Sequence, residues 1–291
     1  MTLSFDSMAL LPLIDANDES GTCLLKTEQS LRVGPDSVWG MSKAWISGQP
    51  RPDAEVRLFC FAHAGGGAAL FRRWEDHLAP GVDVCPVVLP GREGRLRETP
   101  YDRMDELITP LTEALRPYAD RPYALFGHSM GSAVAWEVAR SLTPGQGEPV
   151  LLFVSGRRAP HLPTTRRRFS DLSEDDLLVE MGNLNGTPTE VLDQPGLLDV
   201  FLPTLRADFT LNEHYTPLPG PDLTCPISAL LGDADPEVDP DEIAAWHDTT
   251  KGGFTLRVFP GDHFYLKGPR PEVLDAIQED LDRALLSPFV R

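Results

Sequence analysis

Three residue types that together perform nucleophilic catalysis each follow a separate apolar run in this sequence. Ser129 is the centre of G-H-S-M-G, Asp235 ends G-D-A-D, and His263 lies in G-D-H-F. A serine hydroxyl is a weak nucleophile until a histidine takes its proton, and that histidine needs a carboxylate to orient it. We therefore expect Ser129 to be the nucleophile, His263 the base and Asp235 the orienting acid.

The serine lies in the context that a nucleophile elbow requires. The apolar run Y-A-L-F precedes it, and a helix-period segment, 130–142, follows it. Flanking glycines permit the strained strand-to-helix turn that pushes a serine hydroxyl outward, and a helix N-terminus favours developing negative charge. Because a bare G-x-S-x-G pattern also arises by chance, the strand, turn and helix around Ser129 carry the prediction.

The acid has a rival in the same loop. Asp233 precedes Asp235 by two residues, and both follow the apolar run P-I-S-A-L-L. In proteins with this elbow the acid and then the histidine follow the serine along the chain, an order that either aspartate satisfies. We favour Asp235 and keep Asp233 as the alternative.

A second glycine-rich segment, F-A-H-A-G-G-G at 61–67, follows another apolar run. Consecutive small residues let backbone N–H groups approach an oxyanion, and the residue after the nucleophile supplies a second donor. We expect the amides of Ala64 and Met130 to form this oxyanion hole. Neither G-x-x-x-x-G-K-[ST] nor G-x-G-x-x-G can be read here, and no H-E-x-x-H or clustered Cys and His set exists, so we expect no cofactor and no metal.

The elements that must position these residues alternate from Val56 onward, as is typical of β–α units around a largely parallel sheet in an α/β protein. We expect strands at 56–62, 82–89, 123–126, 150–154, 226–231 and 255–259. We expect helices at 104–115, 130–142, 241–247 and 271–285. Each candidate catalytic residue then follows a strand, which is where α/β sheets place their sites.

The alternation stops at 157–222, where helix-like pieces at 172–181 and 197–209 replace strands. Such a stretch is too long for a structureless loop in a compact domain, so we expect a helical insertion. Its apolar side chains either pack the insertion onto the body or line a substrate channel. Within this insertion, five arginines follow one another without an intervening acid: Arg157, Arg158, Arg166, Arg167 and Arg168. They are either solvated edge residues or a docking patch for an acidic or phosphorylated partner.

Residues 1–42 differ from the rest, with polar and acidic stretches and broken periodicity. We expect them to form a poorly ordered extension before a single domain at 43–291. Met41 is a second candidate for the start of the folded protein.

Charge and cysteine content restrict the partners and the compartment. The chain has 26 basic and 44 acidic residues and a formal charge of −18, which disfavours binding to nucleic acid or to an anionic membrane surface. The four cysteines are widely spaced, no apolar run approaches the length of a membrane span, and the first residues lack the basic region of a secretory signal. We expect a cytoplasmic protein.

Five motifs, taken in order, resemble the type II thioesterases that accompany polyketide synthases and nonribosomal peptide synthetases, a branch of the α/β-hydrolases. The motifs are F-A-H-A-G-G-G, L-P-G-R-E at 89–93, G-H-S-M-G, R-A-D-F with the following E-H-Y at 206–215, and G-D-H-F-Y-L at 261–266. L-P-G-R-E and R-A-D-F are more specific to this family than the elbow, which all esterases share. The resemblance spans roughly 45–286.

The resemblance implies an α/β-hydrolase fold in which the insertion is a mobile lid over an acyl pocket and the predicted triad and oxyanion residues keep their roles. It implies a stand-alone editing enzyme of antibiotic biosynthesis that hydrolyses acyl groups from the phosphopantetheine arm of acyl or peptidyl carrier proteins through an acyl-enzyme. We expect it to act as a monomer. A general carboxylic-ester hydrolase or an acyltransferase with the same catalytic residues, and a non-catalytic binding protein of this fold, remain the alternatives.

Overall fold

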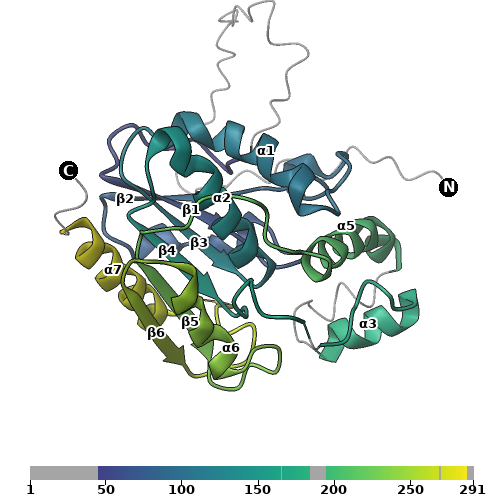
Figure 1. Cartoon of the computed structure of the whole chain (residues 1–291). Coiled ribbons are helices and arrows are strands. Elements are labelled where there is room, and N and C mark those ends of the chain that lie inside the picture. Colours follow the sequence, from purple (N-terminus) through teal and green to yellow (C-terminus); the bar gives the residue numbers. More distant parts are fainter. Residues whose placement is uncertain (1–44, 165, 184–194, 269, 287–291) are drawn as a thin grey trace, which may run out of the picture. The chain divides into compact units, whose positions relative to one another are not determined.

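The computed structural model describes residues 45–164, 166–183, 195–268 and 270–286. The extension predicted at 1–42, with Met41, lies outside these residues. Within them, six parallel strands form one sheet in the order β2-β1-β3-β4-β5-β6 (Figure 1). The strands are β1 Val56–Phe61, β2 Val82–Pro86, β3 Tyr123–His128, β4 Leu151–Ser155, β5 Ile227–Gly232 and β6 Phe254–Phe259.

All six predicted strands are present, and their ends differ by a few residues. β3 continues to His128 because that residue still pairs with Ser155 of β4. β2 ends at Pro86, since the next residue, Val87, forms an antiparallel bridge with Ile46 instead. The parallel sheet and its flanking helices confirm the predicted α/β class.

Helices cover both faces of the sheet. α1 (Met104–Leu115), α2 (Met130–Gln146) and α6 (Pro240–Ala244) pack on one face, and α7 (Pro271–Leu285) packs on the other (Figure 1). Because both faces of the sheet are covered at its centre, the side chains of central strands are buried whichever way they point, and every residue of β1 and β3 is buried. This explains why the strands read as continuous apolar runs.

Two of the predicted helices end differently from expectation. The helix predicted at 241–247 is divided into α6 and a 3₁₀ turn, Ala245–Thr249. α2 continues formally to Gln146, but Pro144 and Gly145 leave helical dihedral angles. Proline lacks an N–H and its ring clashes with the preceding turn, so the regular part of α2 ends close to the predicted boundary.

The insertion is helical among its described residues, as predicted. α3 (Glu174–Asn183) and α5 (Pro195–Glu213) correspond to the helical pieces expected at 172–181 and 197–209, with shifted ends. Both helices lie at one end of the sheet (Figure 1). α3 follows Ser173, whose Oγ accepts the Asp176 N–H at 3.2 Å and so satisfies one of the unpaired amides of the first turn.

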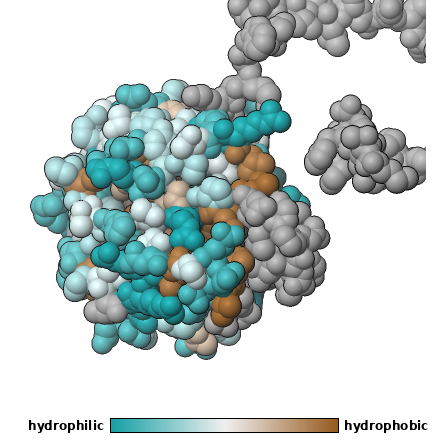
Figure 2. All heavy atoms as spheres, turned by 90° about the vertical axis from the view of Figure 1, so that its right-hand side faces the viewer, coloured by the Kyte–Doolittle hydropathy of each residue, from teal (hydrophilic) through white to brown (hydrophobic). Residues whose placement is uncertain are grey.

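The face that carries α3 and α5 has a mixed surface. Apolar side chains appear there among hydrophilic ones (Figure 2), and Val179, Val200 and Phe201 are exposed on the two helices. A membrane-spanning helix needs about 20 mostly apolar residues, and no helix among the described residues has that length and hydropathy.

Candidate active site

Ser129 occupies the turn between β3 and α2 in a strained backbone conformation. Its φ is +53° and its ψ is −118°, values that a non-glycine residue rarely adopts. The serine N–H donates to Ser155 O on β4 at 2.7 Å, which anchors the turn to the neighbouring strand. Strain of this kind persists only where surrounding contacts impose it, and it is concentrated at functional sites.

Close packing explains both glycines of G-H-S-M-G. A Cβ on Gly127 would lie within 3.0 Å of the Gly131 carbonyl group, and a Cβ on Gly131 would lie within 3.0 Å of Phe61 O at the end of β1. The turn, the first residues of α2 and the end of β1 therefore meet backbone to backbone. This contact places Ser129 beside the segment that follows β1.

The structure brings His263 and Asp235 together. His263 Nδ1 lies 2.9 Å from Asp235 Oδ2 and 3.0 Å from Oδ1, and the two side chains are 8% and 0% exposed. Asp235 Oδ1 also accepts the Glu237 N–H at 2.8 Å, which fixes the carboxylate within its own loop. The rival Asp233 instead accepts the Gly261 N–H at 3.0 Å and joins the two loops away from the imidazole.

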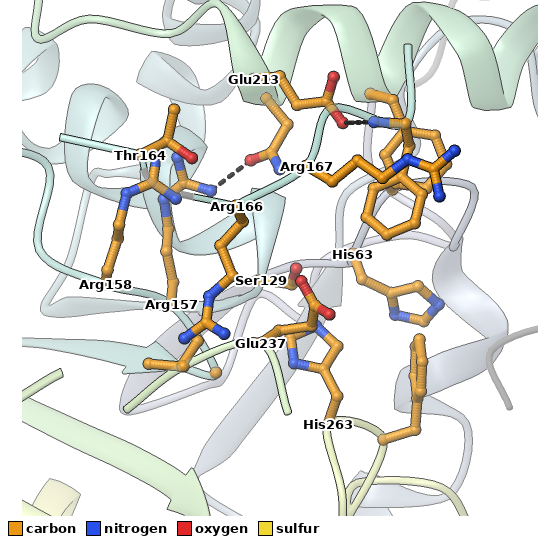
Figure 3. A pocket seen from close by; sticks show the side chains of 17 residues that line it. His63, Ser129, Arg157, Arg158, Thr164, Arg166, Arg167, Glu213, Glu237 and His263 are labelled. Carbon is orange, nitrogen blue, oxygen red and sulfur yellow. Dashed lines mark hydrogen bonds between the residues drawn. The ribbon is translucent and has the colours of Figure 1, made fainter. Parts of the chain in front are cut away.

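Ser129 and His263 line the same pocket at the end of the sheet (Figure 3). The pocket has a volume of about 780 Å³ with its solvent-open mouth included, and Ala64 and Phe264 also line it. The loops that supply these residues follow β1, β3 and β6, so the sheet gathers them at the carboxyl ends of its strands, as expected for this class of fold.

The two amides predicted for the oxyanion hole flank the serine. Ala64 lines the pocket, and Met130 is the first residue of α2, directly after Ser129. No described residue accepts a hydrogen bond from either amide. An unpaired N–H in the first turn of a helix is available to a ligand, and the helix dipole favours negative charge there.

Two further histidines, one in the glycine-rich segment at 61–67 and one in the elbow, surround the base. The ring of His128 lies 5.8 Å from that of His63 and 5.2 Å from that of His263, measured between centroids. Burial, followed by the charge of His263, lowers the pKa of His63 to about 3, and burial also holds the pKa of His128 well below its ordinary value. Both rings are therefore neutral around pH 7, and their lowered pKa values make them weak proton acceptors.

A series of side-chain hydrogen bonds holds the His128 ring in place. His128 Nδ1 lies 2.9 Å from Ser155 Oγ, which lies 2.6 Å from the hydroxyl of Tyr265. All three side chains are buried. Nothing in the sequence pattern indicates this series, because its members come from three separate segments.

The five arginines of the insertion do not form one exposed patch. Arg157 is buried and donates to Asn212, and burial lowers its pKa to about 10. Arg166 pairs with Asp239 at 3.2 Å and with Glu242 at 3.1 Å. The cluster is therefore partly buried and partly neutralised by acids that are distant in sequence.

The remaining arginines lie nearer to solvent. Arg158 is half-buried in the wall of the pocket beside Arg157 (Figure 3). Arg167 is exposed and pairs with Glu180 at 2.8 Å, and Arg168 is exposed and contacts His214 at 3.3 Å. Only these last two could meet a partner directly on the outer surface.

Acidic groups also line the pocket. Glu237 lies near Ser129 and His263 (Figure 3), and burial raises the pKa of its carboxyl group. Glu213 accepts the N–H groups of Phe169 and Ser170 at 2.7 and 3.1 Å. No group of three or more His, Cys, Asp or Glu side chains within the described part of the chain is arranged to hold a metal ion.

Comparison with known proteins gives a consistent result. The model of the thioesterase domain family matches residues 56–281. The chain is 40% identical over 243 residues to thioesterase PikA5 of Streptomyces venezuelae, covering 82% of this chain and 86% of PikA5. It is 38% identical over 249 residues to the protein named linear gramicidin dehydrogenase LgrE of Brevibacillus parabrevis, covering 84% and 95%.

Among solved structures, the chain is similar to the type II thioesterase BorB from the borrelidin biosynthetic cluster, with 41% identity and a TM-score of 0.74 over 83% of this chain and 99% of BorB. The family match covers the sheet, the elbow and the insertion, and it extends over well more than half of the chain. This chain is therefore a member of the thioesterase domain family.

Proposed function

We propose that this protein is a stand-alone type II thioesterase that hydrolyses acyl groups from the phosphopantetheine arm of acyl or peptidyl carrier proteins. The observation that carries the proposal is the arrangement of Ser129 at a strained turn in one pocket with His263, whose Nδ1 faces Asp235. PikA5 and BorB, which are named as thioesterases, support the thioester as the bond that is cleaved.

In the first half of the reaction, His263 takes the proton of Ser129 as the serine oxygen attacks the thioester carbonyl carbon. Asp235 orients the imidazole and stabilises the charged form that results. The carbon–sulfur bond then breaks, and His263 returns the proton to the departing thiol. A thiol with a pKa near 8.5 leaves far more readily than an alcohol, so activation of Ser129 is the main requirement.

The developing negative charge on the carbonyl oxygen is stabilised by the amides of Ala64 and Met130. Both are backbone donors in place before the reaction, and preorganised donors of this kind contribute on the order of 10²–10³-fold each to the rate. The first turn of α2 adds the favourable end of its dipole.

In the second half, His263 deprotonates a water molecule that attacks the acyl-serine. The ester bond to Ser129 breaks, the serine oxygen regains its proton, and the free acid is released. An acyltransferase would differ only at this step, by admitting an alcohol or amine in place of water.

The proposed partner is a carrier protein that presents an acidic surface to the exposed arginines of the insertion. Arg167 and Arg168 are the arginines of the insertion that are exposed, and we place the docking contact there, with Arg158 on the pocket wall. The thiols of Cys60, Cys85 and Cys225 are buried and free, which supports a reducing, cytoplasmic location. We propose that the enzyme acts as a monomer and needs no cofactor of its own.

The rivals differ in what they require. A dehydrogenase, the activity in the name of LgrE, would need a nucleotide site, and the loop after β1 reads H-A-G-G-G where a dinucleotide fingerprint would read G-x-G-x-x-G. A non-catalytic binding protein would not need the contact of His263 with Asp235. A general ester hydrolase would use the same triad, so substrate tests must separate it.

The experiment is time-resolved intact mass spectrometry of several acyl groups loaded on a phosphopantetheinyl carrier protein, with wild type and Ser129→Ala, beside a p-nitrophenyl ester. We expect wild type alone to remove the acyl mass, at a rate well above that for the ester. Ser129→Ala should lose at least about a thousandfold in kcat. A carrier that stays loaded while the ester is cleaved quickly would identify a general esterase instead.

A further inference from the structure

A buried ion pair joins the two motifs that have no part in the reaction described above. Arg92, of L-P-G-R-E, donates from Nη2 to Asp208 Oδ1 at 2.7 Å and from Nη1 to Asp208 Oδ2 at 2.9 Å. Asp208, of R-A-D-F, lies on α5 in the insertion, and the two side chains are 6% and 2% exposed. The pair is bidentate and almost completely shielded from solvent.

The same pair holds the backbone that follows the expected oxyanion donor. Asp208 Oδ2 accepts the N–H of Gly65 at 2.7 Å, and Arg92 Nη1 donates to Gly66 O at 2.9 Å. Gly65 comes directly after Ala64, so the peptide between them is fixed in orientation by the carboxylate. The Gly65 N–H is engaged by Asp208 and the Gly66 N–H by His63 O, so neither faces a substrate oxygen, whereas no described residue accepts a hydrogen bond from the Ala64 N–H.

The surrounding contacts leave little room for the loop to adopt another position. Gly65 has a φ of +75°, and a Cβ there would lie 2.8 Å from Leu205 on α5. Thr204, also on α5, donates from Oγ1 to the carbonyl oxygen of Gly91 on the neighbouring loop at 2.7 Å. α5 therefore contacts both loops through successive residues of one helical turn.

A purely stabilising role does not account well for a buried ion pair at this position. Removing two charges from water is expensive, and a well-packed apolar pair of similar volume is often equally stable or more stable. What an apolar pair cannot do is accept the Gly65 N–H and donate to the Gly66 carbonyl. Both of these bonds act on the loop that carries Ala64.

We propose that Asp208 is a positioning residue for the oxyanion hole: held by Arg92, it fixes the Gly65 N–H and thereby aims the Ala64 amide at the carbonyl oxygen of the substrate. The proposal rests on the proposed acyl transfer at Ser129. It adds that the insertion supplies part of the catalytic geometry and does not merely cover the pocket.

The test compares Asp208→Asn with Thr204→Val, which removes the α5 hydrogen bond to Gly91 O but leaves the ion pair intact. Steady-state kinetics are measured on an acyl-carrier thioester and on a p-nitrophenyl ester, together with the affinity for a trifluoromethyl ketone, which forms a tetrahedral oxyanion on the serine. Thermal unfolding is measured for each protein.

We expect Asp208→Asn to lower kcat by about 10–1,000-fold on both substrates, with KM changed less than threefold and the pH at half-maximal kcat unchanged. Affinity for the ketone should fall in parallel with kcat/KM, since both depend on the oxyanion donors. Thr204→Val should keep kcat within about threefold of wild type, even if its unfolding temperature falls as much as that of Asp208→Asn. Asp208→Glu should recover part of the lost rate because it restores the charge.

If Asp208→Asn does not fold, Arg92→Lys tests the same point, because it keeps a positive charge while losing the bidentate contact and the bond to Gly66 O. An intermediate loss of kcat with parallel loss of ketone affinity supports the proposal. Normal kcat in a destabilised Asp208→Asn, or a rise in KM alone, would overturn it. Wild type that cleaves neither substrate refutes the proposed function itself, so the two failures are distinct.

Discussion

Asp235 faces the imidazole of His263 with both carboxylate oxygens within 3.0 Å of Nδ1, across 28 residues of sequence. The contact joins the loop after β5 to the loop after β6, two strands that lie side by side in the sheet. Parallel pairing therefore sets the distance between acid and base. It also leaves Nε2 as the imidazole nitrogen that Asp235 does not engage.

This relationship predicts the effect of replacing the acid. Asp235→Asn should lower kcat by on the order of 10³–10⁴-fold, because an amide no longer stabilises the charged imidazole or the required tautomer. Asp233→Asn is the matched control, since its oxygen can still accept the Gly261 N–H, and it should retain at least a tenth of wild-type kcat. Steady-state hydrolysis of an acyl thioester measures both, and a larger loss in Asp233→Asn would reverse the assignment of the acid.

A second prediction concerns the packing beneath the elbow. Gly131→Ala should lower the free energy of unfolding by about 2–5 kcal/mol, because its Cβ would press on the backbone of Phe61. Gly94→Ala is the control, since a Cβ there meets nothing within 4 Å, and its effect should stay within about 0.5 kcal/mol. Urea unfolding checks both. Equal stability of the two variants would show that the turn can relax.

The low pKa of His63, a half-buried residue that lines the pocket, predicts how stability depends on pH. The folded-state pKa of His63 is about 3, below its ordinary value, so between about pH 6.5 and pH 3 the unfolded chain binds a proton that the native protein does not. Stability should therefore fall as the pH falls through this window. His63→Gln should reduce the slope by up to about 1.4 kcal/mol per pH unit, measured by urea unfolding at pH 5, 6 and 7. An unchanged slope would contradict a neutral His63 in the native protein over this pH range.

A fourth prediction concerns the point where the insertion rejoins the body. Glu137 on α2 is buried and accepts the Tyr215 hydroxyl at 2.6 Å and the Leu218 N–H at 2.9 Å. Glu137→Ala should cost about 3–5 kcal/mol of unfolding free energy, because it removes the carboxylate that pairs with the buried Arg140 and accepts from the half-buried Tyr215 and Leu218. The control is Glu148→Ala, which also removes contacts to a loop, at Thr224, but in an exposed position. Its cost should stay below about 1 kcal/mol, and chemical denaturation compares the two.

The strands and the positions of the candidate triad could be predicted because they depend on local pattern. A strand covered on both faces is apolar throughout, and the elbow, acid and base each follow such a strand in a fixed order. The pairing of Arg92 with Asp208 spans 116 residues, and the contact of Ser155 with Tyr265 spans 110. No periodicity links such positions, so the first could be seen only as two family motifs and the second not at all.

The arginines of the insertion show how a local sequence pattern can mislead when their partners are distant in sequence. Five arginines between positions 157 and 168, with no acid among them, suggest a basic surface as long as only the neighbouring sequence is considered. The acids that pair with them, Glu180, Asp239 and Glu242, come from other elements, and Arg157 is buried against Asn212. Charge clusters along a chain predict the local composition, whereas folding decides how much of that charge reaches solvent.

The contact of α5 with the loops after β1 and β2 also limits how this enzyme can be recombined with its relatives. Breakpoints placed at the ends of the insertion would take Thr204, Leu205 and Asp208 from one parent and Gly65 and Arg92 from the other. In a chimaera designed to exchange acyl preference, the contacts between α5 and these two loops would then come from different parents and would not match. Crossovers that keep the loops and α5 from a single parent preserve these contacts, and acyl preference can be exchanged elsewhere in the insertion.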